Sequence, residues 1–159
     1  MSTVKPIPEK YHRVTPYIVV KNAAEAIQYY KNIFGAVENM RIERPDGKVG
    51  HAEIKIGDST IMLCDECPEM GGYAPKSDQG SFSLCLYVED VDTTIKHAVD
   101  AGASVKMPVQ NQFYGDRSGS IVDPFGHIWH IATQVEAVSP EELQKRMDNM
   151  MKQKSKETS

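Results

Sequence analysis

The sequence predicts an α+β fold made of two copies of one unit, in which a strand is followed by a helix and three more strands. Three observations predict it: an internal repeat, the order of strand and helix patterns within each copy, and a length suited to one domain. At 159 residues, with 40% hydrophobic and 25% charged residues, the chain has an ordinary globular composition and can bury a substantial core.

The first copy spans residues 14–65. It opens with VTPYIVVKN, a β-rich run, and continues with AAEAIQYYKNIFGA, in which apolar residues recur at helical spacing and Gly35 marks the end of the helix. Turn signals at Pro45-Asp46-Gly47 and Gly57-Asp58 then divide the remainder into three strands.

The second copy spans residues 81–134 and repeats this order. SFSLCLYVED alternates apolar and polar residues as a strand does, and VDTTIKHAVDAGA is a predicted helix that ends at Gly102. ASVKMPV and RSGSIVDPFGHIWHIAT supply the remaining strands, the last two joined at Pro124-Phe125-Gly126. A shift of 68 residues superposes Ile27 on Ile95. Two copies form a pseudo-symmetric pair, whereas a solenoid needs three or more repeats.

The segments outside the two copies have simpler compositions. Residues 66–80 are rich in Gly, Pro and polar residues, so we expect a linker that is partly ordered or acts as a flap. Ser139 and Pro140 begin a predicted helix, whose apolar stripe consists of Leu143, Met147, Met150 and Met151. Residues 152–159 are expected to be disordered. We therefore divide the chain into a domain of residues 1–135 and a C-terminal helix and tail of residues 136–159.

Composition and charge exclude several classes of partner. A net charge of −4 and a pI near 5.7 argue against binding nucleic acid. No apolar run approaches the roughly 20 residues of a membrane-spanning helix, so no membrane partner is expected. Residues 1–13 contain no apolar signal-peptide core, and three cysteines do not form a disulfide framework. We expect a cytoplasmic protein.

Several of these segments resemble a known family. PYIVVKNAAEAIQYYKNIFGA and DPFGHIWHI resemble the vicinal-oxygen-chelate superfamily of glyoxalases, bleomycin-resistance proteins and extradiol dioxygenases, over about residues 14–135. HAEIKIGDSTIMLCDE together with FYGDRSGSIVDPFGHIW is similar to its PhnB-like branch. The resemblance implies that the two units form a curved mixed sheet around a small-molecule cavity, often beside a divalent metal.

Alternation along the strands predicts which side chains face that cavity, because successive residues of a strand point to opposite faces. In the first copy these include Thr15, Tyr17, His51, Glu53 and Met62, and in the second they include Ser83 and His130. We expect His51 and His130 to line the same cavity.

The resemblance implies four metal-ligand positions, one on the first strand and one on the last strand of each copy. By alignment these are Thr15, Met62, Ser83 and His130. Of the four, His130 alone is a competent ligand for a divalent metal, so we expect no metal cofactor. An alternative stays open, because His51 and Glu53 could join His130 as a different set of ligands.

The string Phe113-Tyr114-Gly115-Asp116-Arg117 is the most site-like segment outside the predicted strands. Its arginine offers a bidentate fork for a carboxylate or phosphonate, and an aromatic ring beside it suits an organic molecule. We predict Tyr114, Asp116 and Arg117 as ligand-binding residues, although an Asp116–Arg117 surface pair or a turn that fixes the loop explains the string equally well.

Two functions fit these residues. The first is a protein that binds a small polar organic ligand without a metal, as bleomycin-resistance proteins do. The alternative is an enzyme, a lyase, isomerase or transferase, with His51 or His130 as the acid or base and a divalent metal as an option. In either case we expect a homodimer, because members of the superfamily commonly dimerise and the stripe of the C-terminal helix needs a cover.

Overall fold

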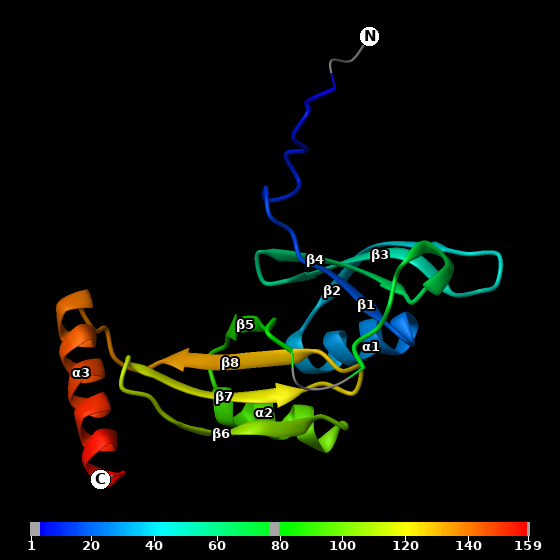
Figure 1. The fold of residues 1–159 in the computed structure, drawn as a ribbon. Helices are drawn as coiled ribbons and strands as arrows, with labels where there is room; N and C mark the ends of the chain where they lie inside the picture. Colours follow the sequence, from blue (N-terminus) through cyan, green and yellow to red (C-terminus); the bar gives the residue numbers. More distant parts are fainter. Residues whose placement is uncertain (1–3, 77–79, 159) are drawn as a thin grey trace. The chain divides into compact units, whose positions relative to one another are not determined.

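The computed structural model describes residues 4–76 and 80–158, and these residues form two compact units, each built on a four-stranded sheet (Figure 1). The first unit takes in the described chain up to residue 76 together with Pro124–Gly126. The second comprises Gly80–Asp123 and residues 127–158. Each unit combines a mixed sheet with a helix, so the predicted α+β class of two strand–helix–three-strand modules is confirmed.

In the first unit, α1 covers one face of the sheet. The elements are β1 (Tyr17–Val20), α1 (Ala23–Phe34), β2 (Val37–Glu43), β3 (Val49–Ile56), β4 (Ser59–Asp65) and a 3₁₀ turn (Pro68–Met70). The strands lie in the order β1-β4-β3-β2, with β1 parallel to β4 and the other pairs antiparallel. Apolar side chains of α1 such as Ile27 and Tyr30 are buried together with Ile54 and Leu63 of the sheet.

The boundaries of α1 follow from its sequence. The Asn22 side chain accepts a hydrogen bond from the backbone N–H of Glu25 and caps the first turn. At the other end Gly35 adopts φ +66°, a left-handed conformation that glycine enters without the steric cost of a side chain.

The second unit repeats this arrangement and adds a helix. Its elements are β5 (Leu84–Tyr87), α2 (Val91–Asp100), β6 (Ser104–Asn111), β7 (Asp116–Val122), β8 (Ile128–Gln134) and α3 (Pro140–Glu157). The strand order is β5-β8-β7-β6, again with one parallel pair, β5 with β8. Val91, Ile95 and Ala98 of α2 are buried, as are Trp129 and Ile131 of β8.

The repeat extends to a buried polar contact at the start of each helix. In the first unit the Asp65 carboxylate accepts hydrogen bonds from the N–H groups of Ala23 (2.9 Å) and Val49 (2.8 Å). At the equivalent place in the second unit, the Thr133 hydroxyl accepts from the N–H of Val91 at 3.0 Å. Each contact ties the first residue of a helix to the last strand of its own unit.

The structure corrects one expectation for the segments outside the two copies. Residues 152–157, expected to be disordered, are helical, because α3 continues to Glu157 through lysines and glutamine, which favour helix, without a Gly or Pro to stop it. Residues 77–79 of the predicted linker and residue 159 of the predicted tail lie outside the described residues, as do residues 1–3. No helix in the described parts of the chain is long and apolar enough to cross a membrane.

Candidate functional site

Each sheet has an open face, defined here as the face opposite its helix, and polar side chains gather there. On the first sheet Tyr17 pairs with Met62 and Met62 pairs with Glu53, so these three residues lie in a row across β1, β4 and β3. On the second sheet the equivalent row across β5, β8 and β7 is Cys85, His130 and Ser120. The two rows occupy equivalent positions in the repeat, but their side chains differ in chemical character.

A chain of hydrogen bonds crosses the open face of the first sheet. The Tyr17 hydroxyl lies 3.0 Å from Nδ1 of His51, and Nε2 of His51 lies 3.4 Å from Oε1 of Glu53. One neutral tautomer of His51 satisfies both contacts, with Nδ1 accepting from Tyr17 and Nε2–H donating to Glu53. The chain leads from a buried carboxylate, 5% exposed, to a tyrosine that is 48% exposed. Tyr17 therefore forms the accessible end.

The electrostatics of this chain favour recognition by hydrogen bonds. Burial and contact with the Cys64 thiol raise the pKa of Tyr17 to about 12, so the phenol stays protonated near neutral pH. Burial also raises the pKa of Glu53, but hydrogen bonds from Tyr11 and His51 and the charge of Lys10 outweigh it and leave that pKa below its usual range. The chain thus has an anion at its base and a neutral phenol at its accessible end, whose single proton is donated to His51 and whose oxygen can accept a hydrogen bond from a ligand.

The N-terminal arm, residues 4–16, brings two groups to Glu53 that the sequence did not identify. The Tyr11 hydroxyl donates to Oε1 of Glu53, and Nζ of Lys10 lies 4.0 Å from Oε2. The arm precedes the first strand and has no counterpart in the second copy, so neither the repeat nor the alternation could reveal these contacts. The Lys10 ammonium also lies 4.7 Å from the centre of the Tyr11 ring.

The arm and the first sheet together enclose two cavities. One, of about 640 Å³, contains Glu53 and is lined by polar side chains that include Asn39, Lys55 and Thr60. The other, of about 360 Å³, is more apolar and contains Met62 and Thr15 among its lining residues. Thr15 donates its hydroxyl to the His12 carbonyl at 3.0 Å, so its side chain is already engaged by the arm.

On the second sheet His130 forms a smaller polar site. Its Nδ1 lies 3.1 Å from the Ser120 hydroxyl, and both residues line a cavity of about 220 Å³ with Ser83 and Lys106. His130 and Ser83 are thus brought together in the second unit, while His51 belongs to the first. That both histidines line one cavity stays a prediction.

Asp116 and Tyr114 lie at the end of the second sheet where β7 begins. The Tyr87 hydroxyl donates to the buried Asp116 carboxylate at 2.8 Å, and this contact raises the pKa of Tyr87. Burial, with the nearby Asp116 charge, raises the pKa of the Cys85 thiol. The Tyr114 hydroxyl lies 3.3 Å from the Ser118 hydroxyl, so each of the two predicted residues has its own hydrogen-bond partner.

The Arg117 side chain does not take part in the contacts of Asp116 and Tyr114. Its guanidinium forms a bidentate ion pair with Asp92, at 2.6 and 2.8 Å, and also donates to Asn111. Asp92 lies in the first turn of α2, which covers the opposite face of the sheet. Because neighbours on a strand face opposite ways, Arg117 is separated from the group around Asp116. The alternative Asp116–Arg117 surface pair is not formed either, because Asp116 is bonded to Tyr87 and Arg117 to Asp92.

The residues at the superfamily's metal positions do not fit a divalent metal. They supply one imidazole, one thioether and two hydroxyls, from His130, Met62, Thr15 and Ser83. The His130 Nδ1 is in contact with Ser120 and the Thr15 hydroxyl with His12. Over residues 4–76 and 80–158, no three His, Cys, Asp or Glu side chains are arranged to hold a metal ion.

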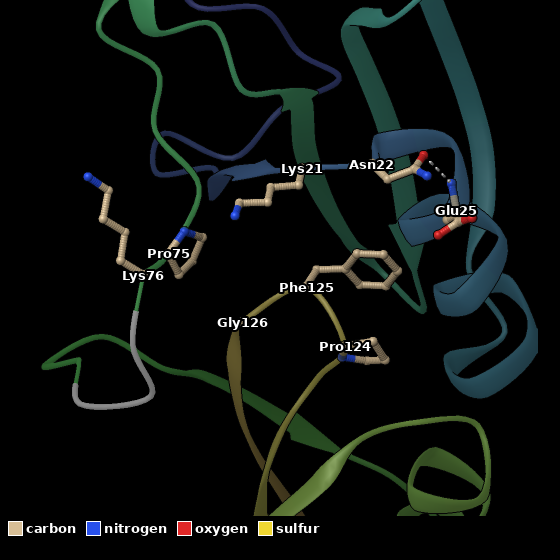
Figure 2. A pocket seen from close by; sticks show the side chains of 8 residues that line it. All are labelled: Lys21, Asn22, Glu25, Pro75, Lys76, Pro124, Phe125 and Gly126. Atoms are coloured by element: carbon tan, nitrogen blue, oxygen red, sulfur yellow. Dashed lines mark hydrogen bonds between the residues drawn. The ribbon is translucent and has the colours of Figure 1, made fainter.

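A further cavity of the first unit lies at the start of α1 and measures about 420 Å³ (Figure 2). Phe125 forms one wall and packs edge-on against Tyr29 and Tyr30, at centroid distances of 5.9 and 6.1 Å. Lys21 and Lys76 provide the cationic groups in the lining. The backbone N–H groups of Ala23 and Glu25 are already bonded to Asp65 and Asn22, so the helix terminus offers little further capacity for an anion.

Comparison with known proteins identifies the family of this chain and solved structures that share its fold. The profile of the Glyoxalase/Bleomycin resistance protein/Dioxygenase superfamily matches residues 10–131. An uncharacterized protein of Mycobacterium tuberculosis is 40% identical over 140 residues, which cover 86% of this chain and 82% of that protein. The PhnB protein of Bacillus cereus is 18% identical, with a TM-score of 0.62 over 77% of this chain and 99% of that one. FosX, a fosfomycin resistance protein of Listeria monocytogenes solved with Mn(II) and sulfate, is 19% identical, with a TM-score of 0.62 over 86% and 97% of the two chains. At these identities the two structures share the fold with this chain.

Proposed function

Because this chain belongs to the glyoxalase/bleomycin resistance protein/dioxygenase superfamily, as its sequence motifs implied, we propose that it binds a small polar organic molecule on the open faces of its sheets. We propose further that it does so without the divalent metal often found in this superfamily. On the first unit, taken by itself, the residues that would contact a ligand are Tyr17, His51, Glu53 and Met62; on the second unit, taken by itself, they are Ser83, Tyr114, Asp116 and His130.

The Tyr17–His51–Glu53 chain is the observation that carries this proposal. It is a set of fixed donors and acceptors that runs from a buried carboxylate to an accessible phenol. Binding sites for small molecules commonly place a few oriented polar groups in a concave surface. A metal at this point would need several anionic or imidazole ligands, and the carboxylate Oε1 is already taken by Tyr11 and His51.

The test combines metal analysis with ligand screening. Protein purified without an affinity tag is expected to contain no stoichiometric divalent metal. A thermal-shift screen of small organic acids, amines and phosphonates in EDTA is expected to yield ligands whose shift is lost in His51→Ala. His97→Ala, an exposed histidine on α2, is the matched control and keeps the shift. Ligands that bind only after a divalent metal is added would overturn the metal-free proposal.

The enzyme alternative rests on the same histidine. In the Glu53–His51–Tyr17 chain a carboxylate orients an imidazole toward a hydroxyl, which is an arrangement used in acid–base catalysis. The raised pKa of Tyr17 opposes its use as a base or nucleophile near neutral pH. Turnover of a ligand from the screen, with a rate that His51→Ala abolishes, would favour the enzyme.

We also propose that the protein forms a homodimer through α3. Arg146 attaches this helix to its own unit through Glu136 and the Phe113 carbonyl, while no described residue of α3 is buried. Met147 and Met151 are 40% and 57% exposed, so the apolar stripe is accessible to a second copy. Sedimentation is expected to show a dimer that Met147→Lys weakens. A monomer at every concentration would contradict this proposal.

A further inference from the structure

The Glu53 side chain is buried, but one of its carboxylate oxygens, Oε2, accepts no hydrogen bond from the described residues. Its side chain is 5% exposed, and Oε1 is held by Tyr11 and His51. Among the described residues, Oε2 has its nearest cation at 4.0 Å, the Lys10 ammonium, which is beyond hydrogen-bond distance. Glu53 is one of the residues that line the cavity of about 640 Å³.

A buried carboxylate of this kind favours a cationic ligand. Burial of an anion is costly unless hydrogen bonds and a cation compensate for it, and here the hydrogen bonds of Tyr11 and His51 both reach Oε1, while the cation nearest to Oε2 is 4.0 Å away and 65% exposed. A ligand ammonium inside the cavity could approach Oε2 to the roughly 2.8 Å of a charge-assisted hydrogen bond. The charged lining adds to this preference, because it holds three carboxylates and two ammonium groups: Glu9, Glu53, Asp58, Lys10 and Lys55.

The neighbouring cavity indicates what the rest of the ligand is like. It has a volume of about 360 Å³ and is lined largely by apolar groups, including Ile7 of the arm and Met62 of β4. Tyr11 and His12 line both cavities and therefore stand between them. A molecule with an ammonium head at Glu53 and an apolar tail toward Met62 would occupy both cavities, with the Tyr11 ring between its two ends.

We propose that the first unit binds a small amphiphilic primary amine, with Glu53 as the partner of its ammonium group and Tyr11 as the residue that sets how its tail is accommodated. This inference rests on the proposed function, since it names the ligand class for the same open face. Lys10 then acts as the chain's own competitor for the ligand's ammonium group, held near Oε2 when no ligand is present.

The experiment uses three molecules of equal length, namely hexylammonium, hexanol and hexanoate, and measures their binding to the full chain by calorimetry. Hexylammonium is expected to bind at least about tenfold more tightly than hexanol, because a hydrogen bond between an ammonium and a carboxylate is stronger than one between a hydroxyl and a carboxylate. Hexanoate is expected to bind more weakly than hexanol, because its charge has the same sign as that of Glu53. Equal binding of hexylammonium and hexanoate by the wild-type protein would overturn the inference without any variant.

Variants then assign the roles. Glu53→Gln is expected to weaken hexylammonium about tenfold or more, whereas Glu43→Gln, an exposed glutamate on β2, leaves it unchanged. Lys10→Gln is expected to strengthen binding by removing the competing cation. Met62→Ala is expected to weaken hexylammonium while leaving ethylammonium unaffected, because only the longer tail reaches the second cavity.

The outcomes also separate this inference from the proposed function. If no alkylammonium binds, but another organic ligand still gives a metal-independent thermal shift that His51→Ala removes, the amine assignment is wrong and the proposed function stands. If Glu53→Gln binds hexylammonium as the wild type does, Glu53 is not the recognition group. Circular dichroism of each variant establishes that it is folded before its binding is compared.

Discussion

Asp65 offers a quantitative test of how the first unit is held together. Its carboxylate is 5% exposed and accepts from the N–H of Ala23, the first residue of α1, and of Val49, the first residue of β3. A hydrogen bond to a charged group contributes about 1.5–3 kcal/mol, so Asp65→Ala, which removes both, is expected to lower the free energy of unfolding by about 3–6 kcal/mol. Asp65→Asn keeps one acceptor oxygen and is expected to cost about half as much.

Urea unfolding followed by circular dichroism measures these costs. Asp58→Asn makes the same chemical change at an exposed carboxylate of the β3–β4 turn and is expected to alter stability by less than about 0.5 kcal/mol. In the second unit, Thr133→Val removes the bond accepted from the Val91 N–H and the bond donated to the Val88 carbonyl. Both join neutral groups, so Thr133→Val is expected to cost less than Asp65→Ala. If Asp65→Ala cost no more than Asp58→Asn, the bridge between α1 and β3 would contribute nothing and the reasoning would be wrong.

Two further predictions concern the site. Trp129→Ala is expected to lower the free energy of unfolding by about 3–5 kcal/mol, because the indole is 2% exposed and donates to Asp123. His130→Ala, on the open face, is expected to lower it much less. If denaturant unfolding gave the reverse order, the two faces of β8 would be misassigned. Glu53 has a pKa below its usual 4.5, so its ionisation stabilises the fold fully above that value, and this stabilisation is lost as the pH falls through the lower pKa of the folded state. The wild type is therefore expected to lose stability relative to Glu53→Gln between about pH 5 and pH 3, and a difference independent of pH would refute the assignment.

Much of the fold could be predicted because its determinants are local. Alternation over a few residues was enough to place Tyr17 and Glu53 opposite the buried Ile18 and Ile54. The same alternation rule predicts the placement of Arg117, because Arg117 directly follows Asp116 on β7 and its side chain must point to the opposite face of the sheet. The predicted strand began at Arg117, one residue later than β7 does, so Asp116 was grouped with Arg117 in one motif instead of being placed on the opposite face of the same strand.

The contacts of the arm could not be predicted in that way. Tyr11 and Glu53 are 42 residues apart, and the arm has neither a periodic pattern nor a repeat partner. A long-range contact of a single side chain leaves no trace in local spacing. A buried glutamate on an open face was the available clue, because burial of its charge requires a partner from outside the strand.

The two copies agree in the contacts that hold the fold and differ on their open faces. Where the contacts hold the fold, the copies agree: Asp65 and Thr133 both bind the first N–H of a helix. On the open faces they differ, since the place of Glu53 in the first sheet is taken by Ser120 in the second. At this place of the repeat the first sheet therefore offers a carboxylate and the second a neutral hydroxyl, so the polar group that each open face suits is different.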